Sequence, residues 1–299
     1  MNIGFRPYTS QAGITEDYFR VYDFLAEEGL RGYTYARWAW MATHSYLQRE
    51  NVGRMGLWEE AGRLVAAALF DCSLDDIFLL VRPGYECLRP EMIAYAQERL
   101  ASEHFALLIA EGDETFQAQA AGLGYRATPS VEREAVLFPD GGAFDNPLPE
   151  GYRCVSLAER PDFYQYLRVL YRGFDHEKNG EGPFAPSEEE RAWIQTHAQS
   201  LDPHENLQLK IAVEAPDGSF AAFAGLWYDA RTDFAVVEPV ATDPDHRRRG
   251  LGRAAVLEGV RRVADLGAKA VYVGSDQPFY YGLGFQPYRS YVRWVRRGR

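Results

Sequence analysis

The spacing of hydrophobic positions predicts a series of short strands and helices along the chain. Alternating apolar residues, rich in β-branched and aromatic side chains, indicate strands, whereas apolar residues three and four positions apart indicate helices. The first half of the chain is predicted to form a strand, two helices, a hairpin, a strand, a helix, a strand and a helix, at residues 3–8, 16–28, 33–47, 55–70, 76–82, 90–100, 106–110 and 115–121.

The second half repeats this order. Its predicted strand, two helices, hairpin, strand, helix and strand lie at residues 152–157, 163–174, 188–199, 207–228, 234–237, 254–266 and 270–273. Glycines of matching turns are 160 positions apart for Gly124 and Gly284, and 156 for Gly62 and Gly218. The same order of elements at a nearly fixed offset predicts a duplicated domain.

A stretch rich in Gly and Pro, residues 139–150, separates the two copies. This composition is typical of a linker, and a chain of 299 residues is long enough for two domains. We therefore predict one domain over residues 1–147 and a second over residues 148–299.

The most specific chemical signal is a strand, a basic turn and a helix start in the second copy. The apolar run 234–237 leads through Pro239 to the sequence Arg247-Arg248-Arg249-Gly250-Leu251-Gly252-Arg253. The unpaired N–H groups and the positive dipole end of a helix start suit a phosphate, and the two glycines would let it approach the main chain closely. Alone, a Gly-x-Gly turn is a weak signal, and an arginine run usually lies on a solvated face.

The spacing Arg247-x-x-Gly250-x-Gly252 resembles motif A of the GNAT superfamily of acyl-CoA-dependent N-acyltransferases. The downstream segment Phe279-Tyr280-Tyr281-Gly282-Leu283-Gly284-Phe285 resembles the one that closes the family's domain, and a short strand lies between the two motifs. The resemblance implies an α/β fold with a mixed sheet. It implies two tandem GNAT-like domains, each with a mostly antiparallel central sheet, helices on both faces and a splayed pair of strands.

The resemblance also implies where acetyl-CoA would bind as co-substrate. Main-chain N–H groups after Arg247 would hold its pyrophosphate, and arginine side chains would add charge. Exposed main-chain groups on a bulged central strand would pair with the pantetheine arm and hold the thioester oxygen; an ordinary strand end is the alternative. The implied carrier-binding residues are Val240, Ala241, Thr242, Arg247, Arg248, Arg249, Gly250, Leu251, Gly252 and Arg253.

Two residues take catalytic roles in this resemblance. Tyr280 falls on the family's tyrosine, which donates a proton to the leaving thiolate; the alternative is a core aromatic residue with a satisfied hydroxyl. Glu238 lies where many relatives place a glutamate that deprotonates the ammonium acceptor, directly or through water; the alternative is a scaffold ion pair. An amine of pKa about 10 is almost wholly protonated at neutral pH, so the reaction needs such a route.

The closing segment departs from the family pattern. Many relatives carry an asparagine and about one more helical turn before the tyrosine, whereas here Pro278 leads directly into Phe279. This predicts a shortened helix, with Ser275 as a weak substitute for the asparagine. On the acceptor side, residues 174–184 are acidic and aromatic and would suit a cationic amine; a solvated loop is the other interpretation.

The first copy lacks these motifs. Its turn, residues 81–90, has a single Gly84 followed by Glu86 and contains no Gly-x-Gly, and the position that matches Tyr280 is Ala120. We therefore interpret the first copy as a degenerate GNAT-like domain and the second as the working one.

Charge and composition narrow the function further. The formal net charge of −11 argues against nucleic-acid binding, which depends on neutralising phosphates. Residues 241–299 hold twelve Lys or Arg and five Asp or Glu, which fits either a basic tail or an electropositive site for a small polyanion such as coenzyme A. The three cysteines and six histidines show no metal-ligand spacing. We expect no metal, no signal peptide, no membrane span and a cytoplasmic location.

The leading hypothesis is therefore an N-acetyltransferase that moves an acetyl group from acetyl-CoA to a primary amine of a small molecule or peptide by direct attack on the thioester. A homodimer is possible. The alternatives are a CoA-binding module without catalysis and a scaffold protein without a ligand. Intact motif residues argue against the first alternative and a retained phosphate turn against the second.

Overall fold

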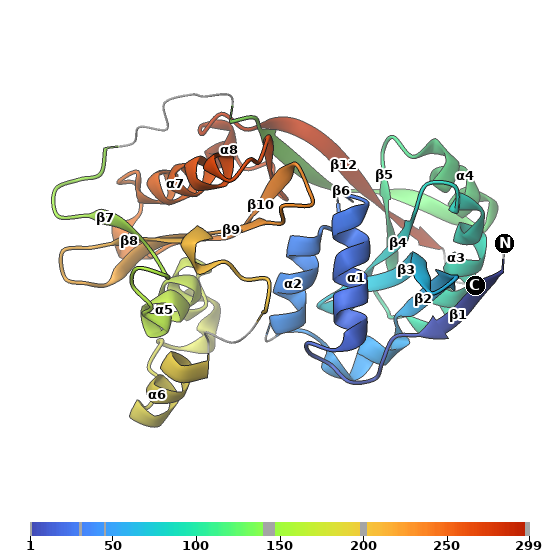
Figure 1. Ribbon diagram of the computed structural model, residues 1–299, viewed down its shortest axis with the longest axis horizontal. Helices are drawn as coiled ribbons and strands as arrows, with labels where there is room; N and C mark the ends of the chain where they lie inside the picture. Colours follow the sequence, from blue (N-terminus) through green and yellow to red (C-terminus); the bar gives the residue numbers. More distant parts are fainter. Residues whose placement is uncertain (1, 30–31, 45, 140–146, 198–201, 297–299) are drawn as a thin grey trace. The chain divides into compact units, whose positions relative to one another are not determined.

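The computed structural model describes residues 2–29, 32–44, 46–139, 147–197 and 202–296. Within these ranges the chain divides into two compact units (Figure 1). Unit 1 comprises the residues up to 135 together with residues 274–276 and 287–296, and unit 2 comprises residues 136–273 and 277–286. Most of the predicted linker, residues 140–146, lies outside the described residues.

The order of elements confirms the predicted repeat. The first series is β1 (Ile3–Pro7), α1 (Glu16–Glu27), α2 (Tyr35–Thr43), β2 (Gly56–Glu60), β3 (Arg63–Asp71), β4 (Ser73–Val81), α3 (Arg89–Arg99), β5 (Ala106–Ala110), α4 (Glu114–Gly122) and β6 (Tyr125–Leu137). The second is β7 (Arg153–Ser156), α5 (Phe163–Gly173), α6 (Glu188–His197), β8 (Lys210–Glu214), β9 (Phe220–Tyr228), β10 (Phe234–Thr242), α7 (Leu251–Asp265), β11 (Ala270–Val273), α8 (Pro278–Tyr281) and β12 (Gln286–Arg296). Both series read βααβββαβαβ.

Each unit is built on a sheet in which most of the described strand pairs are antiparallel and one described pair is parallel. In unit 1 the strand order is β1-β2-β3-β4-β5-β12-β6, and β4 and β5 form the parallel pair. In unit 2 the order is β11-β10-β9-β8-β7, and β10 and β11 form the parallel pair. The parallel pairs occupy matching places in the two series, since each joins a central strand to the strand that follows the next helix.

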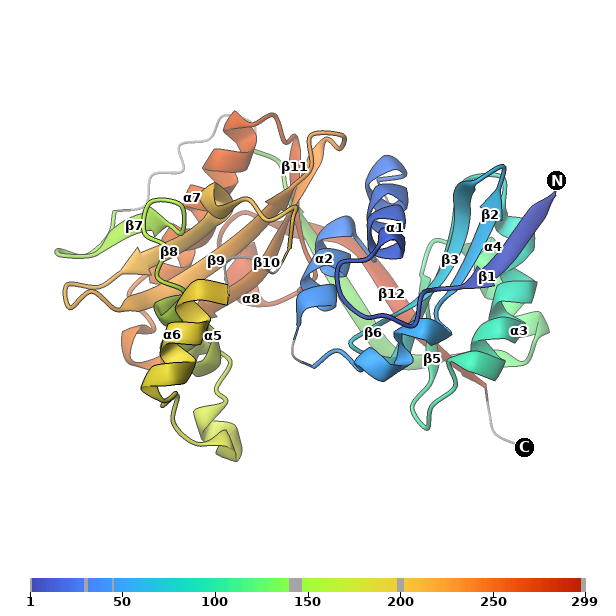
Figure 2. The same ribbon diagram turned by 60° about the horizontal axis from the view of Figure 1, so that its bottom comes forward.

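Helices cover both faces of each sheet. In unit 2, a Cβ on Gly259 of α7 would lie 2.0 Å from Leu226 Cδ1 of β9, whereas Phe223 of the same strand packs on Tyr166 of α5, with ring centroids 4.8 Å apart. Because side chains alternate along a strand, Leu226 and Phe223 point to opposite faces. In unit 1, α1 and α2 lie on one side of β2, β3 and β4, and α3 and α4 on the other (Figure 2).

The last strand of the chain belongs to unit 1. β12 pairs antiparallel with β5, from Tyr291 opposite Ala110 to Trp294 opposite Leu107. The hydrophobic pattern predicted neither β6 nor β12, and the predicted division between residues 147 and 148 would have grouped β12 with unit 2. The division at residue 147 stays a prediction about where the two duplicated sequences meet. The two compact units are a different grouping, because β12 packs with the strands of unit 1.

Most predicted elements lie within two or three residues of their observed positions. The helix predicted over residues 33–47 is shorter in the structure: α2 starts after Thr34, which caps it by accepting a hydrogen bond from the Arg37 N–H, and it ends at Thr43. α7 begins three residues earlier than predicted, directly after Gly250. The shortened helix before the closing motif is observed as α8, which has four residues. No helix in the described ranges is long and apolar enough to cross a membrane.

Candidate functional site

The central strand of unit 2 separates from its parallel neighbour. β10 and β11 are paired from Phe234 opposite Ala270 to Val236 opposite Tyr272. Within the described residues their ladder consists of three residue pairs. Beyond Val236, β10 continues alongside β9 as far as Thr242. The edge of Val240–Thr242 that faces away from β9 therefore has no strand beside it in the described residues.

A β-bulge marks the point of separation. Val237 lies opposite Leu226 and Val240 opposite Ala224, so Glu238 and Pro239 together lie opposite Gly225. A Cβ on Gly225 would lie 2.6 Å from the Glu238 carbonyl oxygen and 3.0 Å from Pro239 Cδ, so only glycine fits there. The bulge changes which main-chain groups of β10 point away from β9. It lies immediately before Val240, Ala241 and Thr242, where the sequence predicted it.

The turn after β10 leaves main-chain donors open. Arg248 and Gly250 have left-handed backbone conformations, with φ of 66° and 79°. The first hydrogen bond of α7 runs from the Ala254 N–H to the Gly250 carbonyl, at 3.0 Å. Within the described residues, the main-chain N–H groups of 248–252 donate no hydrogen bond. The turn and the first turn of α7 thus present free donors at the positive end of a helix.

The two glycines of this turn have different roles. Gly250 has open space around its Cα, so its left-handed φ is what favours glycine there. Gly252 is buried, and a Cβ on it would lie 2.8 Å from Thr242 Oγ1 and 3.6 Å from the Phe279 ring. Gly252 therefore lets α7 start directly against β10 and the closing segment.

The arginines predicted to surround a phosphate do not act alike. The Arg247 guanidinium points inward, where Nη2 donates to the Gly173 carbonyl at 2.9 Å and the group pairs with Asp175. Arg249 Nη1 donates to the Tyr152 hydroxyl at 2.9 Å, and Arg253 Nη1 donates to the Gly282 carbonyl at 2.8 Å. The Arg248 side chain is exposed and makes no hydrogen bond within the described residues. The structure therefore places Arg247 as a brace of the turn, and leaves Arg248 and Arg249 on its outer side.

The buried carboxylate of Asp243 links the turn to helix α5. Asp243 is fully buried, and its carboxylate accepts from the Asp245 N–H at 3.0 Å and from Arg172 Nη1 at 2.8 Å. Arg168 Nη1 lies 3.1 Å from the same carboxylate. Both arginines are on α5, so the start of the turn is tied to the helix on the opposite face of the sheet from α7.

The two predicted catalytic residues lie near one another in unit 2. Tyr280, on α8, is 8% exposed and makes edge-to-face contacts with Phe279 and Phe285. Burial, and then the charge of the nearby Glu238 carboxylate, raise the pKa of Tyr280 to about 12. The Tyr280 hydroxyl makes no hydrogen bond in the part of the chain that the structure describes. The structure thus places the half-buried Glu238 carboxylate near the Tyr280 hydroxyl, beside the bulge of β10.

The family model of the GNAT acetyltransferases matches residues 165–285, a range that holds the bulge, the turn and the closing segment. This part of the chain is similar to a GNAT domain. The whole chain has the tandem GNAT fold.

Solved structures show how far this fold extends. A tandem GNAT protein from the clavulanic acid biosynthesis pathway aligns over 98% of both chains, with a TM-score of 0.61 and 16% identity. A GCN5-related N-acetyltransferase from Sphaerobacter thermophilus aligns over 99% of this chain and 97% of its own, with a TM-score of 0.55 and 16% identity. A GNAT-family acetyltransferase from Colwellia psychrerythraea aligns over 99% and 100%, with a TM-score of 0.57 and 10% identity. No curated protein sequence matches the chain.

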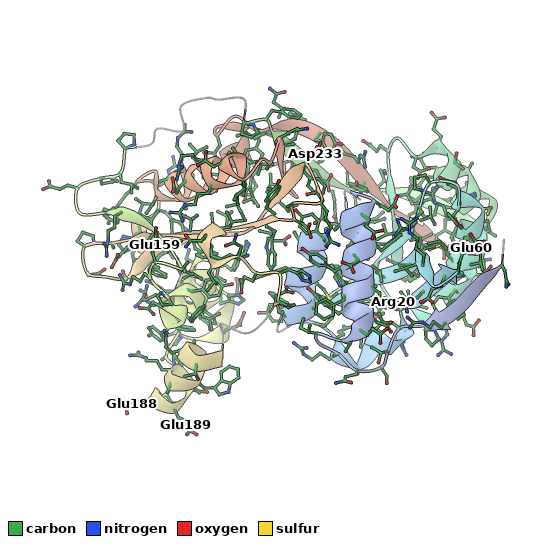
Figure 3. All side chains as sticks on the ribbon, in the orientation of Figure 1. Arg20, Glu60, Glu159, Glu188, Glu189 and Asp233 are labelled. Atoms are coloured by element: carbon green, nitrogen blue, oxygen red, sulfur yellow. The ribbon has the colours of Figure 1, made fainter. Side chains whose placement is uncertain are left out.

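In the predicted acceptor segment, residues 174–184, acidic side chains are engaged in ion pairs within the segment and with the turn and α5. Asp175 pairs with Arg247 and Lys178, Glu177 pairs with Arg172, and Glu181 contacts His176. The residues from Glu177 to Glu181 form a short helical segment that is kinked at Gly180, which has a φ of 91°. Farther along, Glu188 and Glu189 lie at the outer end of α6 and point away from the sheet (Figure 3). The segment is thus bound to the turn through Arg172 and Arg247.

The GNAT-like unit 1 has a different turn at the matching place. β4 and β5 also pair over a short stretch, Asp76 opposite Ala106 and Ile77 opposite Leu107. The Glu86 carboxylate then accepts the Gly84 N–H at 3.0 and 3.2 Å. Ala120, which matches Tyr280 in sequence, is fully buried in α4. Unit 1 therefore keeps the short parallel pairing but not the bulge, since β3 and β4 pair in continuous register from Ala66 opposite Val81 to Phe70 opposite Ile77. Its own carboxylate binds a donor of the turn.

Sequence reasoning missed Gly225, Asp243 and the α5 arginines. A glycine inside an otherwise apolar strand is a recognised signal of a bulge or a close backbone approach, so Gly225 could have been found. The ion pairs of Asp243 depend on how α5 crosses the sheet, and no local pattern gives that. In the described residues there is no group of three or more side chains suited to hold a metal ion.

Proposed function

We propose that the protein is an N-acetyltransferase that uses acetyl-CoA to acetylate a primary amine of a small molecule or peptide. The observation that carries this proposal is the pairing of two features at one end of β10. The strand edge of Val240–Thr242 is open after the bulge, and the main-chain donors of 248–252 are open beside it.

These features fit the two ends of the carrier. A pyrophosphate would accept hydrogen bonds from the turn and from the first turn of α7, with Arg248 and Arg249 on its outer side. Charge-assisted hydrogen bonds contribute about 1.5–3 kcal/mol each, so a few of them are enough for micromolar affinity after the cost of association. The pantetheine arm would pair with the open edge of β10. When bound, acetyl-CoA supplies an activated acyl group and a thiolate leaving group.

The residues of the chain then have two tasks. Glu238 takes the proton from the ammonium form of the acceptor, directly or through water, and so frees its lone pair. Tyr280 gives a proton to the departing sulfur, and its raised pKa keeps the phenol protonated throughout the neutral range. Because a thiol has a pKa of about 8.5, below that of the phenol, this transfer is uphill and requires the hydroxyl to be hydrogen-bonded to the sulfur as the C–S bond breaks. The proton that the acylated nitrogen loses then restores the phenol.

Several features of the proposed setting follow from charge and composition. A net charge of −11 repels nucleic acid and favours a cationic acceptor, and the cysteine spacing favours a cytoplasmic protein. Acetyl-CoA is the co-substrate in this proposal, with no metal, no membrane partner and the possibility of a homodimer.

The first test is a calorimetric titration of acetyl-CoA into the protein. We expect one site per chain with a micromolar Kd. A panel of amines is then added, and release of free CoA thiol is measured with and without each amine. No binding of acetyl-CoA by the folded protein would refute the carrier site and the function with it.

One observation favours a carrier-binding protein without catalysis, namely the burial of Tyr280 among aromatic rings. The variant Tyr280→Phe separates the two functions. If Tyr280 is the proton donor, we expect turnover with an accepted amine to fall about 100-fold, while the Kd for acetyl-CoA changes less than twofold. Unchanged turnover would remove Tyr280 from the mechanism, and the absence of any amine-stimulated thiol release in the wild type would favour the non-catalytic protein.

A further inference from the structure

The bulge of β10 is built by the neighbouring strand β9. The Glu238 carbonyl lies in the bulge, where two residues of β10 face Gly225 of β9. Trp227 of β9 supplies a donor instead, since its Nε1–H donates to that carbonyl at 2.9 Å. Gly225 supplies the space, because any side chain there would collide with the same oxygen. One strand thus provides both the room for the bulge and the hydrogen bond that fixes it.

A buried lysine holds the indole in place. Lys210, at the start of β8, is opposite Gly225, and its Nζ lies 3.5 Å from the centroid of the Trp227 ring. The lysine is 2% exposed, and its Nζ lies 3.7 Å from Glu205 Oε1. A cation over the face of an indole is attracted by the ring quadrupole, most strongly when both groups are desolvated. Trp227 is therefore held by its edge and by its face at once.

This arrangement restricts the indole more than packing alone would. Trp227 is 4% exposed, so rotation of the ring would break its buried hydrogen bond to the Glu238 carbonyl and remove the aromatic face from the Lys210 ammonium. Both losses are costly in a buried site. The contacts run across three adjacent strands, from Lys210 on β8 through Trp227 on β9 to the Glu238 carbonyl on β10.

We propose that Trp227, clamped by Lys210, is a positioning residue for the acyl carrier. It fixes the bulge of β10 and so sets the direction of the main-chain groups of Val240–Thr242 that hold the pantetheine arm. This inference rests on the proposed function, since it deepens the account of the same site. The pyrophosphate turn has a separate anchor, Asp243 with Arg172, so the clamp acts on one end of the carrier only.

That separation gives a test with two ligands. Acetyl-CoA needs both the turn and the strand edge, whereas adenosine 3′-phosphate 5′-diphosphate is the nucleotide part of the carrier and needs the turn alone. In Trp227→Phe, which keeps a ring and removes the donor, we expect the Kd for acetyl-CoA to rise about tenfold. The Kd for the nucleotide should change less than twofold. Both are measured by calorimetry on the full chain.

Unit 1 offers a matched control. Trp58 is 1% exposed, and its Nε1 donates to Glu91 Oε1 at 2.8 Å, so Trp58→Phe removes a comparable buried hydrogen bond far from the carrier site in sequence. We expect it to lower stability without changing either Kd. Equal loss of both ligands in Trp227→Phe, or no loss of either, would overturn the inference.

Two further variants keep the inference testable if Trp227→Phe does not fold. Lys210→Met removes the cation and keeps much of the side-chain volume, and Gly225→Ala pushes on the Glu238 carbonyl. Each variant should raise the Kd for acetyl-CoA more than the Kd for the nucleotide. Gly225→Ala should give the larger difference between these two changes. Failure of the wild type to bind either ligand would refute the proposed function. Wild-type binding of both, with no selective loss in these variants, would refute the clamp alone.

Discussion

Each unit has a strand, a turn and a helix in matching positions, and a carboxylate plays a different role in each of the two turns. In unit 1 the Glu86 carboxylate folds back onto the Gly84 N–H, so the anion of the turn is a side chain of the turn itself. In unit 2 the Asp243 carboxylate lies beneath the turn, paired with arginines of α5, and the donors above it stay open. In unit 1 a carboxylate of the turn occupies one of its main-chain donors, whereas in unit 2 the main-chain donors of 248–252 are open to an external anion.

The largest expected effect compares one glycine in each turn. Gly250 and Gly84 have φ of 79° and 89°, and neither has an atom within 4 Å of where a Cβ would lie. Gly250→Asp places a carboxylate among the open donors, and we expect the Kd for acetyl-CoA to rise at least 100-fold, about 3 kcal/mol. Calorimetry measures the loss.

Gly84→Asp is its control, because the substitution is the same and the backbone strain is similar. Each variant should lose about 1 kcal/mol of stability from placing a side chain at a left-handed φ. Gly84→Asp should leave the Kd for acetyl-CoA unchanged. A comparable loss of affinity in both variants would mean that the difference between the turns does not decide carrier binding.

The second prediction compares the carboxylates that anchor the helices. Asp243 is fully buried between Arg168 and Arg172, whereas Asp113, which caps α4 and pairs with Arg89, keeps 30% of its side-chain exposure. Removing a charge from a buried pair leaves the partner uncompensated, so Asp243→Asn should lower the free energy of unfolding by roughly 3 kcal/mol. Asp113→Asn should lower it by about 1 kcal/mol.

Urea unfolding at neutral pH measures both values. If the two variants lose equal stability, the burial of Asp243 is not what distinguishes the anchor of unit 2. Asp243→Asn should also weaken the binding of acetyl-CoA, because the turn loses one of its ties to α5.

The third prediction compares the buried cations of the two units, Lys210 and Arg82, which are 2% and 5% exposed. Burial lowers the pKa of Lys210 from 10.5 to about 8, against the opposing charges of Glu205, Asp202 and Glu238. Below pH 8 the folded and unfolded chains both hold this proton. Between pH 8 and 10.5 the unfolded chain binds it and the folded chain does not, so burial becomes less costly and the unfolding free energy rises with pH.

The expected gain relative to Lys210→Met is about 1.5 kcal/mol between pH 8 and pH 9.5, below the limit of about 1.4 kcal/mol per pH unit for one proton. The measurement is the difference in unfolding free energy between wild type and variant across this range. Arg82→Met serves as the control, because an arginine does not titrate there. Parallel pH profiles for wild type and Lys210→Met would show that Lys210 holds its proton as firmly in the folded chain.

The sequence predicted the local elements well because their signals are local. Hydrophobic periodicity located the helices and the paired strands, and the Gly62 and Gly218 turns marked the hairpins. β6 and β12 were missed. β6 is polar along much of its length and contains Pro129, and the polar and charged residues of β12 do not alternate with apolar ones, since they lie at positions 286, 289, 290, 293 and 296. The pairing of β12 with β5 joins residues near 290 to residues near 110, and only tertiary packing selects such a partner.

In the candidate site, too, the sequence predicted what depends on local spacing and not what depends on tertiary packing. Motif spacing located the turn, the bulged strand and Tyr280, and the roles assigned to them stay predictions. It also placed the Arg247 guanidinium at the phosphate, whereas the structure directs it to the Gly173 carbonyl and Asp175. A motif specifies which residue types lie on a turn, but the direction of a long side chain depends on acceptors that another helix brings within reach.

The smallest expected effect concerns the turn of unit 1, where the Glu86 carboxylate accepts the Gly84 N–H. Glu86→Ala removes the carboxylate from the Gly84 N–H and so opens a donor in unit 1. We still expect a calorimetric stoichiometry of one acetyl-CoA per chain and a change in Kd of less than twofold. The reason is geometric, since α3 begins with Arg89 and Pro90, and the turn has no second glycine to let a phosphate approach the helix. Appearance of a second site would show that a single carboxylate had closed unit 1, and that the rest of its turn is still able to bind the carrier.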